Sequence, residues 1–79
     1  MMRNFRQLSV PARAHPLVRR LFVEMNHHQI CLTDVAERSG VNLKTIKAWR
    51  TQRNPNIVSL EACFGVLGLE LTLRARSEP

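Results

Sequence analysis

The sequence contains little of the material from which active sites and cofactor sites are built. It has only three glycines and no glycine-rich phosphate loop, and its six acidic residues include no pair of carboxylates within an apolar stretch. No nucleophile lies at a recognisable spacing from a general base. We therefore predict that the chain is not an enzyme and that it binds no cofactor.

Cysteine and histidine are also scarce. The two cysteines, Cys31 and Cys63, lie far apart in helical patterns, which is typical of reduced apolar residues and not of a disulfide scaffold. His27, His28 and Cys31 raise the alternative of a zinc site. Adjacent histidines on a helix point about 100° apart, however, and His15 and Cys63 would have to complete the site from a distance. We predict no metal site.

Long apolar runs are absent as well. No segment approaches the roughly 20 apolar residues of a membrane-spanning helix. The N-terminal part has no apolar segment of the kind that precedes the cleavage site of a secretory signal. We expect no membrane partner and a cytoplasmic location. At 79 residues the chain forms one domain, which buries only about 60% of its unfolded surface, so a second copy would add stability.

What the sequence has in excess is positive charge. Twelve lysines and arginines against six acids give a net charge of +6 and a pI of about 11.1. This excess favours a polyanionic partner, of which nucleic acid is the commonest. No acid lies between Glu37 and Glu61, an interval that holds five basic residues: Arg38, Lys44, Lys47, Arg50 and Arg53. A merely solvated basic face is the alternative interpretation.

The basic interval overlaps the stretch from Cys31 to Gln52, whose pattern predicts two short helices joined by a tight turn. Gly40 tolerates the left-handed conformation that often ends a helix, and Asn42 is a good N-cap for the next one. We expect helices over residues 32–39 and 43–51. The second would have a core side and a basic side, formed by Ile46 and Trp49 and by Lys44, Lys47 and Arg50.

Helical spacing predicts one further helix on each side of this stretch. The earlier one begins at Pro16 and ends at His27 or His28, and its apolar face contains Leu17, Leu21, Phe22 and Met25. The later one is capped by Asn56 and ends at Gly68. Its apolar face contains Ile57, Leu60, Cys63, Phe64 and Leu67.

The two ends of the chain differ from the middle, and we place the folded domain at residues 15–68. Residues 1–14 show no helical period and contain three arginines (Arg3, Arg6 and Arg13), so we expect a flexible basic arm, or one packed loosely through Phe5 and Leu8. Residues 69–79 form a C-terminal strand and tail. Leu69, Leu71 and Leu73 alternate with polar residues there, as in a half-buried strand.

A lone strand cannot satisfy its own main-chain groups, and nothing else in the sequence has strand character. We therefore predict that the C-terminal strand pairs with its own copy about a two-fold axis, which makes the protein a homodimer. The alternative is that these residues extend the preceding helix or fray.

The stretch LTDVAERSGVNLKTI resembles the helix-turn-helix of the lambda-repressor-like superfamily, which includes the Cro/repressor (XRE) branch. The resemblance covers about residues 16–68 and implies an all-α bundle of four or five helices whose third helix, at residues 43–51, lies in the major groove of DNA. Cys31 and Leu32 depart from the family, which usually has Ser or Thr and often Gln there. The alternating C-terminal segment resembles that of antitoxin-type members.

The resemblance also assigns DNA-contacting residues. The positions that face bases are Leu43, Lys44, Thr45 and Ala48; of these, Lys44 can donate to guanine, and Leu43 can make only an apolar contact. The positions that suit phosphates, which fix register without reading sequence, are Thr33, Asn42, Lys47, Arg50, Thr51 and Arg53. The alternative is that each of these is an ordinary exposed polar residue without a role in binding. Trp49 is expected in the core.

The function that follows is a sequence-specific, dimeric, DNA-binding transcriptional regulator. The resemblance favours a repressor, either a phage or prophage regulator or an autoregulated antitoxin, which binds a palindromic operator and is bacterial or phage-encoded and nucleoid-associated. The alternative is an interaction protein that neutralises a cognate toxin or enzyme by direct contact, with DNA binding secondary. A third hypothesis is a recombinase accessory factor or a packaging factor that uses the same domain.

Overall fold

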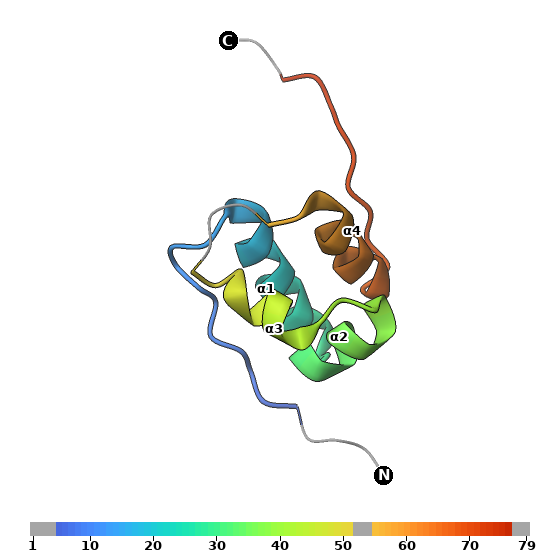
Figure 1. The fold of residues 1–79 in the computed structure, drawn as a ribbon. Coiled ribbons are helices and arrows are strands. Elements are labelled where there is room, and N and C mark those ends of the chain that lie inside the picture. Colours follow the sequence, from blue (N-terminus) through green and yellow to red (C-terminus); the bar gives the residue numbers. More distant parts are fainter. Residues whose placement is uncertain (1–4, 52–54, 77–79) are drawn as a thin grey trace.

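The computed structural model describes residues 5–51 and 55–76 of the chain. Within these ranges it contains four α-helices and no β-strand, which confirms the predicted all-α class (Figure 1). The helices are α1 (Pro16–His28), α2 (Leu32–Ser39), α3 (Leu43–Ala48) and α4 (Ile57–Val66). The remaining described residues are the segment that leads into α1, the turns between helices, and the tail that leaves α4.

Helix α1 begins and ends where local chemistry places it. His15 caps its N-terminus, since Nδ1 accepts a hydrogen bond from the Leu17 N–H at 3.1 Å, and Pro16 suits the first helical position. The predicted apolar face was wrong by one residue, because Val18 is fully buried and Leu17 is only half-buried. The buried stripe repeats at i, i+3, i+4 and i+7, as in an amphipathic helix: Val18, Leu21, Phe22 and Met25.

Helix α2 ends at the predicted glycine. Gly40 adopts a φ of 79° and its N–H donates to the Ala36 carbonyl at 3.0 Å, which is the left-handed termination that glycine tolerates best. The N-terminus of α2 has no side-chain cap, because Cys31 at the N-cap position makes no capping hydrogen bond. Val41 packs against the core after the turn and leads the chain into α3.

Helix α3 is shorter than predicted. The α-helical part ends at Ala48 and not at Thr51. The N–H groups of Arg50 and Thr51 bond to carbonyls only three residues earlier, at 3.2 and 3.1 Å, so the chain tightens after the helix ends. This tightening places Arg50 and Thr51 outside the regular spacing of the α3 surface.

Helix α4 has strong signals at both ends. Asn56 Oδ1 accepts from the N–H groups of Val58 and Ser59, at 2.9 and 3.1 Å. The helix ends at Val66, slightly before the predicted Gly68, which has a φ of 76°. The Gly68 and Leu69 N–H groups bond back to Gly65 and Phe64, both at 3.0 Å, as in a Schellman motif.

The α4 face differs from its prediction at one position. Ile57 was expected to point inward but is 60% exposed. The first turn of α4 extends beyond the core, so its buried residues start at Leu60 and continue with Cys63 and Phe64. Ile57 and its neighbour Val58, which is 71% exposed, are consequently left on the surface.

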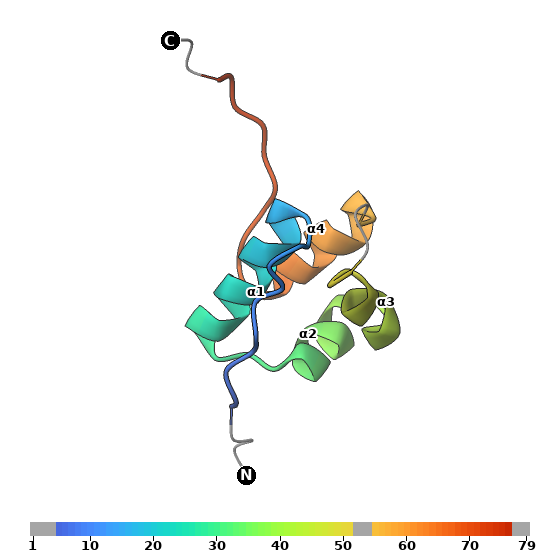
Figure 2. The same ribbon diagram turned by 90° about the vertical axis from the view of Figure 1, so that its left-hand side faces the viewer.

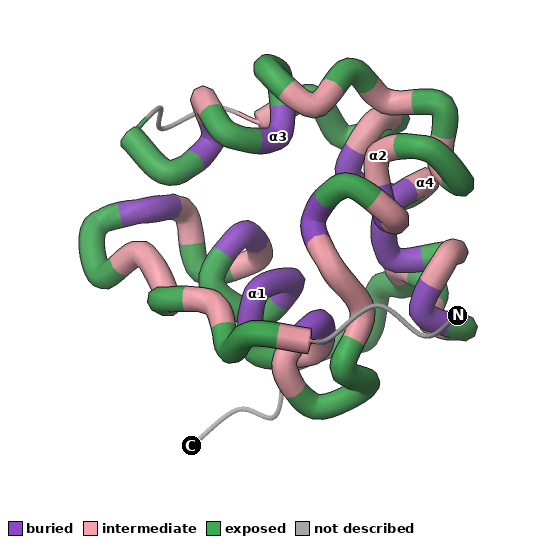
Figure 3. Tube along the Cα trace, turned by 90° about the horizontal axis from the view of Figure 1, so that it is seen from below, coloured by how far each residue is buried: buried purple, intermediate pink, exposed green. Residues whose placement is uncertain are grey.

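The four helices enclose one apolar core. Trp49, at the end of α3, and Phe22, in α1, are its largest fully buried side chains, which confirms that Trp49 belongs to the core. Figure 3 shows buried positions of α1 and α3 turned toward the interior and exposed positions on the outer turns. No polar or charged residue of the described chain is buried, so burial of apolar surface is the main contribution to stability.

The segment before α1 is attached to the helical body. The Leu8 N–H donates to Asn26 Oδ1 at 2.7 Å, and Asn26 Nδ2 donates to the Leu8 carbonyl at 2.9 Å. Leu8 and Val10 pack against the core, and Ala14 is buried. Figure 2 shows the segment running across α1. Of the two expectations for the arm, packing through Leu8 is therefore what residues 8–14 show.

The C-terminal segment leaves the body beyond α4 (Figure 1). Leu69 and Leu71 are half-buried against the core, while Leu73 is 97% exposed. Residues 69–76 form no strand within one chain. The predicted strand needs a second copy to pair with, and it stays a prediction.

Candidate nucleic-acid interface

Helix α3 has one buried side and one exposed, basic side. Ile46 is fully buried and Trp49, directly after the helix, is nearly so. Lys44, Thr45 and Lys47 are exposed. Because the anchors on the inner side fix how the helix is rotated, the two lysines are directed away from the core. An exposed basic surface on an anchored helix is suited to contact a polyanion.

Asn42 fixes the first turn of α3. Its Oδ1 accepts from the Lys44 N–H at 2.8 Å, and its main-chain carbonyl accepts from Thr45 and Ile46. The side-chain oxygen of Asn42 is thus used as a cap, which leaves the amide nitrogen as the group that could donate to a phosphate. The cap orients the residues predicted to face bases.

The four predicted base-facing residues fall into two pairs. Lys44 and Thr45 are exposed, so their polar groups can reach a ligand. Leu43 and Ala48 are half-buried, and Leu43 packs against the core. Since part of Leu43 is already in contact with the protein, only the remainder of this side chain is left for an apolar contact with a base.

Arg50 lies over the ring of Phe22, with its guanidinium carbon 5.4 Å from the ring centroid. This distance suits a cation–π contact, which holds the guanidinium against α1 and beside the end of α3. The Arg50 side chain is exposed, so the guanidinium edge remains free to bind an anion. Thr51 is exposed as well, and its Oγ1 donates to the Ala48 carbonyl at 3.4 Å.

The other predicted phosphate contacts lie further from the centre of α3. Thr33 is exposed in the first turn of α2. Leu32, at the position where the lambda-repressor-like proteins that the sequence resembles often have Gln, is buried and therefore belongs to the core. Arg53 lies outside the described residues. The structure thus brings Lys44, Thr45, Lys47 and Arg50 together on or beside α3, with Thr33 on the neighbouring helix.

His15, His28 and Cys63 each have a polar neighbour within the protein. His15 caps α1, and His28 Nε2 lies 3.5 Å from Glu24 Oε1, the carboxylate that also binds Arg20 at 2.6 Å. The Arg20 hydrogen bond holds the pKa of the Glu24 carboxyl below its ordinary value. Burial raises the pKa of the Cys63 thiol, which donates to Ser39 Oγ at 3.8 Å. In the described part of the chain, no three such ligands gather as a metal site would require.

Sequence reasoning missed two features that bear on interactions. The first is Asn26, which holds the N-terminal segment; the signal was a polar amide at the edge of an apolar helical face. The second is the exposure of Ile57 and Val58 at the start of α4, next to Leu73 of the predicted C-terminal strand. Helical spacing placed Ile57 in the core, so periodicity could not reveal the α4 part of this surface.

Comparison of the chain with protein-family models, with curated proteins and with solved structures finds no match. Among the described residues, no helix has both the length and the apolar character needed to cross a membrane.

Proposed function

We propose that α2, the turn at Gly40 and α3 form a helix-turn-helix of the lambda-repressor type, and that the protein is a sequence-specific DNA-binding regulator, most simply a repressor. One observation carries the proposal. Helix α3 is anchored on one side by buried Ile46 and exposes Lys44 and Lys47 on the other. Such a helix presents side chains to a major groove without disturbing the core that supports it.

In this proposal the residues have separate roles. Lys44, at the start of α3, donates to the O6 and N7 acceptors of guanine, while Thr45 contacts a neighbouring base edge. Lys47 and Arg50 bind phosphates, and the Asn42 amide adds a further phosphate contact. Contacts to phosphates fix the position of α3, so that the few contacts to bases discriminate between sequences.

The regulator acts as a dimer on a palindromic operator. Two copies related by a two-fold axis match two half-sites about one helical turn apart, or about 34 Å. The alternating C-terminal residues supply the dimer contact, as they expose Leu73 and leave Leu71 half-covered. Protein concentration or a protein partner then sets occupancy of the operator.

Selection of bound duplexes from a random pool tests the proposal. We expect a palindromic consensus, and gel shifts with that consensus should show tighter binding than with a scrambled duplex of the same composition. Absence of binding to any duplex at low salt would contradict the proposal. Capture of a stoichiometric protein partner by a chain that binds no DNA would instead favour the interaction protein.

A further inference from the structure

The C-terminal segment has unpaired main-chain groups and two distinct sides. Residues 70–76 make no main-chain hydrogen bond with any other described residue. Leu69 and Leu71 lie against the core, whereas Glu70 and Thr72 are exposed. Residues 69–72 therefore already alternate between covered and exposed positions, as in a half-buried strand, and the main chain of residues 70–76 is free to accept a neighbouring strand.

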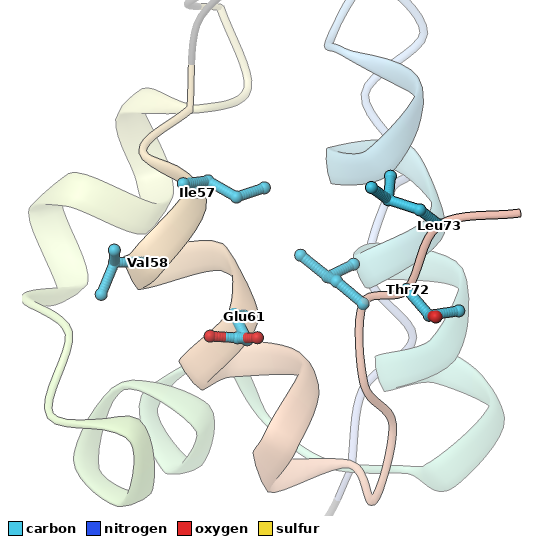
Figure 4. A pocket seen from close by; sticks show the side chains of 6 residues that line it. Ile57, Val58, Glu61, Thr72 and Leu73 are labelled. Carbon is cyan, nitrogen blue, oxygen red and sulfur yellow. The ribbon is translucent and has the colours of Figure 1, made fainter.

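An apolar groove runs beside this segment. It has a volume of about 270 Å³ and lies between the first turns of α4 and the tail. Figure 4 shows the side chains of Ile57 and Leu73 directed toward one another across it. Leu71 also lines the groove, and Glu61 is the acidic residue in its lining. The 60% exposed Ile57 and the 97% exposed Leu73 are thus two walls of one open site.

We infer that this groove receives the C-terminal segment of a second copy, paired antiparallel with residues 69–75 in a register centred on Thr72 of both chains. The inference rests on the dimeric form of the proposed regulator, and it does not depend on DNA binding. It adds the occupant of the groove, the register of pairing and the participation of α4.

Charge and apolarity select the register. Residues directly opposite each other in an antiparallel pair point to the same side, so a register that joins odd to even positions would set leucines against polar residues. Centring on Thr72 places Glu70 opposite Arg74 at both ends, and Leu71 opposite Leu73 on the inner side. Opposite charges and apolar pairs at facing positions both stabilise a sheet.

The neighbouring registers are less complementary. Centring on Leu73 pairs Glu70 with Arg76, but it places Leu71 opposite Ala75 and Thr72 opposite Arg74. Centring on Leu71 leaves Glu70 opposite Thr72 without a basic partner. In the Thr72 register, the second copy's Leu73 lies beside the first copy's Leu71, which lines the groove, and so comes next to Ile57. The most exposed leucine of each copy is then covered by the other.

A charge-reversal series tests the register, with the dimer dissociation constant measured by sedimentation equilibrium at about 50 mM salt, where exposed charges are weakly screened. Glu70→Arg should weaken the dimer about tenfold, because it sets like charges opposite each other twice. Adding Arg74→Glu should restore the wild-type constant to within about threefold. The matched control is Glu70→Arg with Arg76→Glu, which has the same net charge and should not restore it. Rescue by Arg76→Glu in place of Arg74→Glu would overturn the Thr72 register.

A second pair of variants tests the groove. Ile57→Glu adds a charge to the groove and should weaken the dimer at least tenfold. A negative charge is favourable at the N-terminus of a helix, so the substitution should not disturb the start of α4. Val23→Glu alters an apolar residue of α1 that is 46% exposed and outside the groove lining, and should leave the constant within about twofold. Circular dichroism checks that both variants keep their helices. An unchanged constant for Ile57→Glu would overturn the placement of the partner.

The outcome for the wild-type chain separates the two proposals. This inference is overturned if the chain stays monomeric at about 0.5 mM, or if only a different protein binds in the groove. If that monomer still binds its selected duplex, the DNA-binding function stands without it. A dimer that passes both series but binds no duplex overturns the proposed function and leaves the inference intact.

Discussion

At the scale of single residues, Lys44 and Lys47 are both exposed on α3 but are expected to contribute differently to binding. Lys44→Ala should cost about 1–3 kcal/mol on the selected operator and relax the base preference beneath it. Lys47→Ala should weaken all duplexes about equally, because a phosphate contact carries no sequence information. Binding isotherms on matched and mismatched duplexes measure both effects. An unchanged consensus for Lys44→Ala would mean that the start of α3 does not read bases.

Cys31 offers a residue-scale prediction about stability. It occupies the N-cap position of α2 with extended dihedrals (φ −69°, ψ 153°) but makes no side-chain capping bond. A serine there has the hydroxyl needed to accept from an N–H of the first turn, so Cys31→Ser should raise the free energy of unfolding by about 0.5–1 kcal/mol. Urea denaturation measures the change. Cys31→Ala is the control: it removes the thiol without adding an acceptor, and it should not stabilise the protein.

At the scale of elements, the link between the N-terminal segment and α1 depends on one side chain. Asn26 both accepts from and donates to Leu8, eighteen residues earlier. Asn26→Ala removes both hydrogen bonds and should cost about 1–3 kcal/mol of stability. Asn26→Asp keeps the acceptor but sets a carboxylate oxygen against the Leu8 carbonyl in place of the donor, so its cost should be at least as large. Hydrogen exchange of the Leu8 amide reports directly on the contact; equal protection in wild type and Asn26→Ala would contradict it.

Helix α3 shows why an element cannot be judged by its own sequence alone. Its six residues are too few for a stable isolated helix. The Asn42 cap fixes the start, and the burial of Ile46 and Trp49 holds the rest against the body. The residues proposed to contact DNA therefore lie on a helix whose rotation is set by the core, and loss of that packing would disturb binding even with every lysine present.

At the scale of the whole molecule, positive charge should govern affinity. If each copy neutralises three or four phosphates, a dimer covers about six to eight, and the slope of log affinity against log salt should be about −5 to −7. A gel-shift series over salt concentration measures this slope. The Ile57→Glu variant, at concentrations below its measured dimer dissociation constant, serves as the comparison, and its slope should be about half that value. Equal slopes for the two proteins would show that only one copy contacts the DNA.

The sequence by itself determined the helical class and most helix ends. The caps and terminators act within one turn of the chain, so Pro16, Gly40, Asn42 and Asn56 could be placed from local chemistry. The exposed basic residues of α3 could be proposed from periodicity for the same reason. Their contact with DNA stays a prediction, as does the pairing of the C-terminal segment.

Only the tertiary structure decided which apolar residues are covered. Val18 is more deeply buried than Leu17, and Ile57 is exposed although its spacing fits the apolar face of α4. The reason is that burial depends on where the other helices lie. The end of α3 at Ala48 and the hydrogen bonds between Asn26 and Leu8 could not be predicted from the sequence either. Each depends on packing or on residues far apart in the chain, whereas propensity and periodicity report only on near neighbours. The groove beside α4 was also decided by the tertiary structure, since it forms only because the fold brings the tail opposite the start of α4.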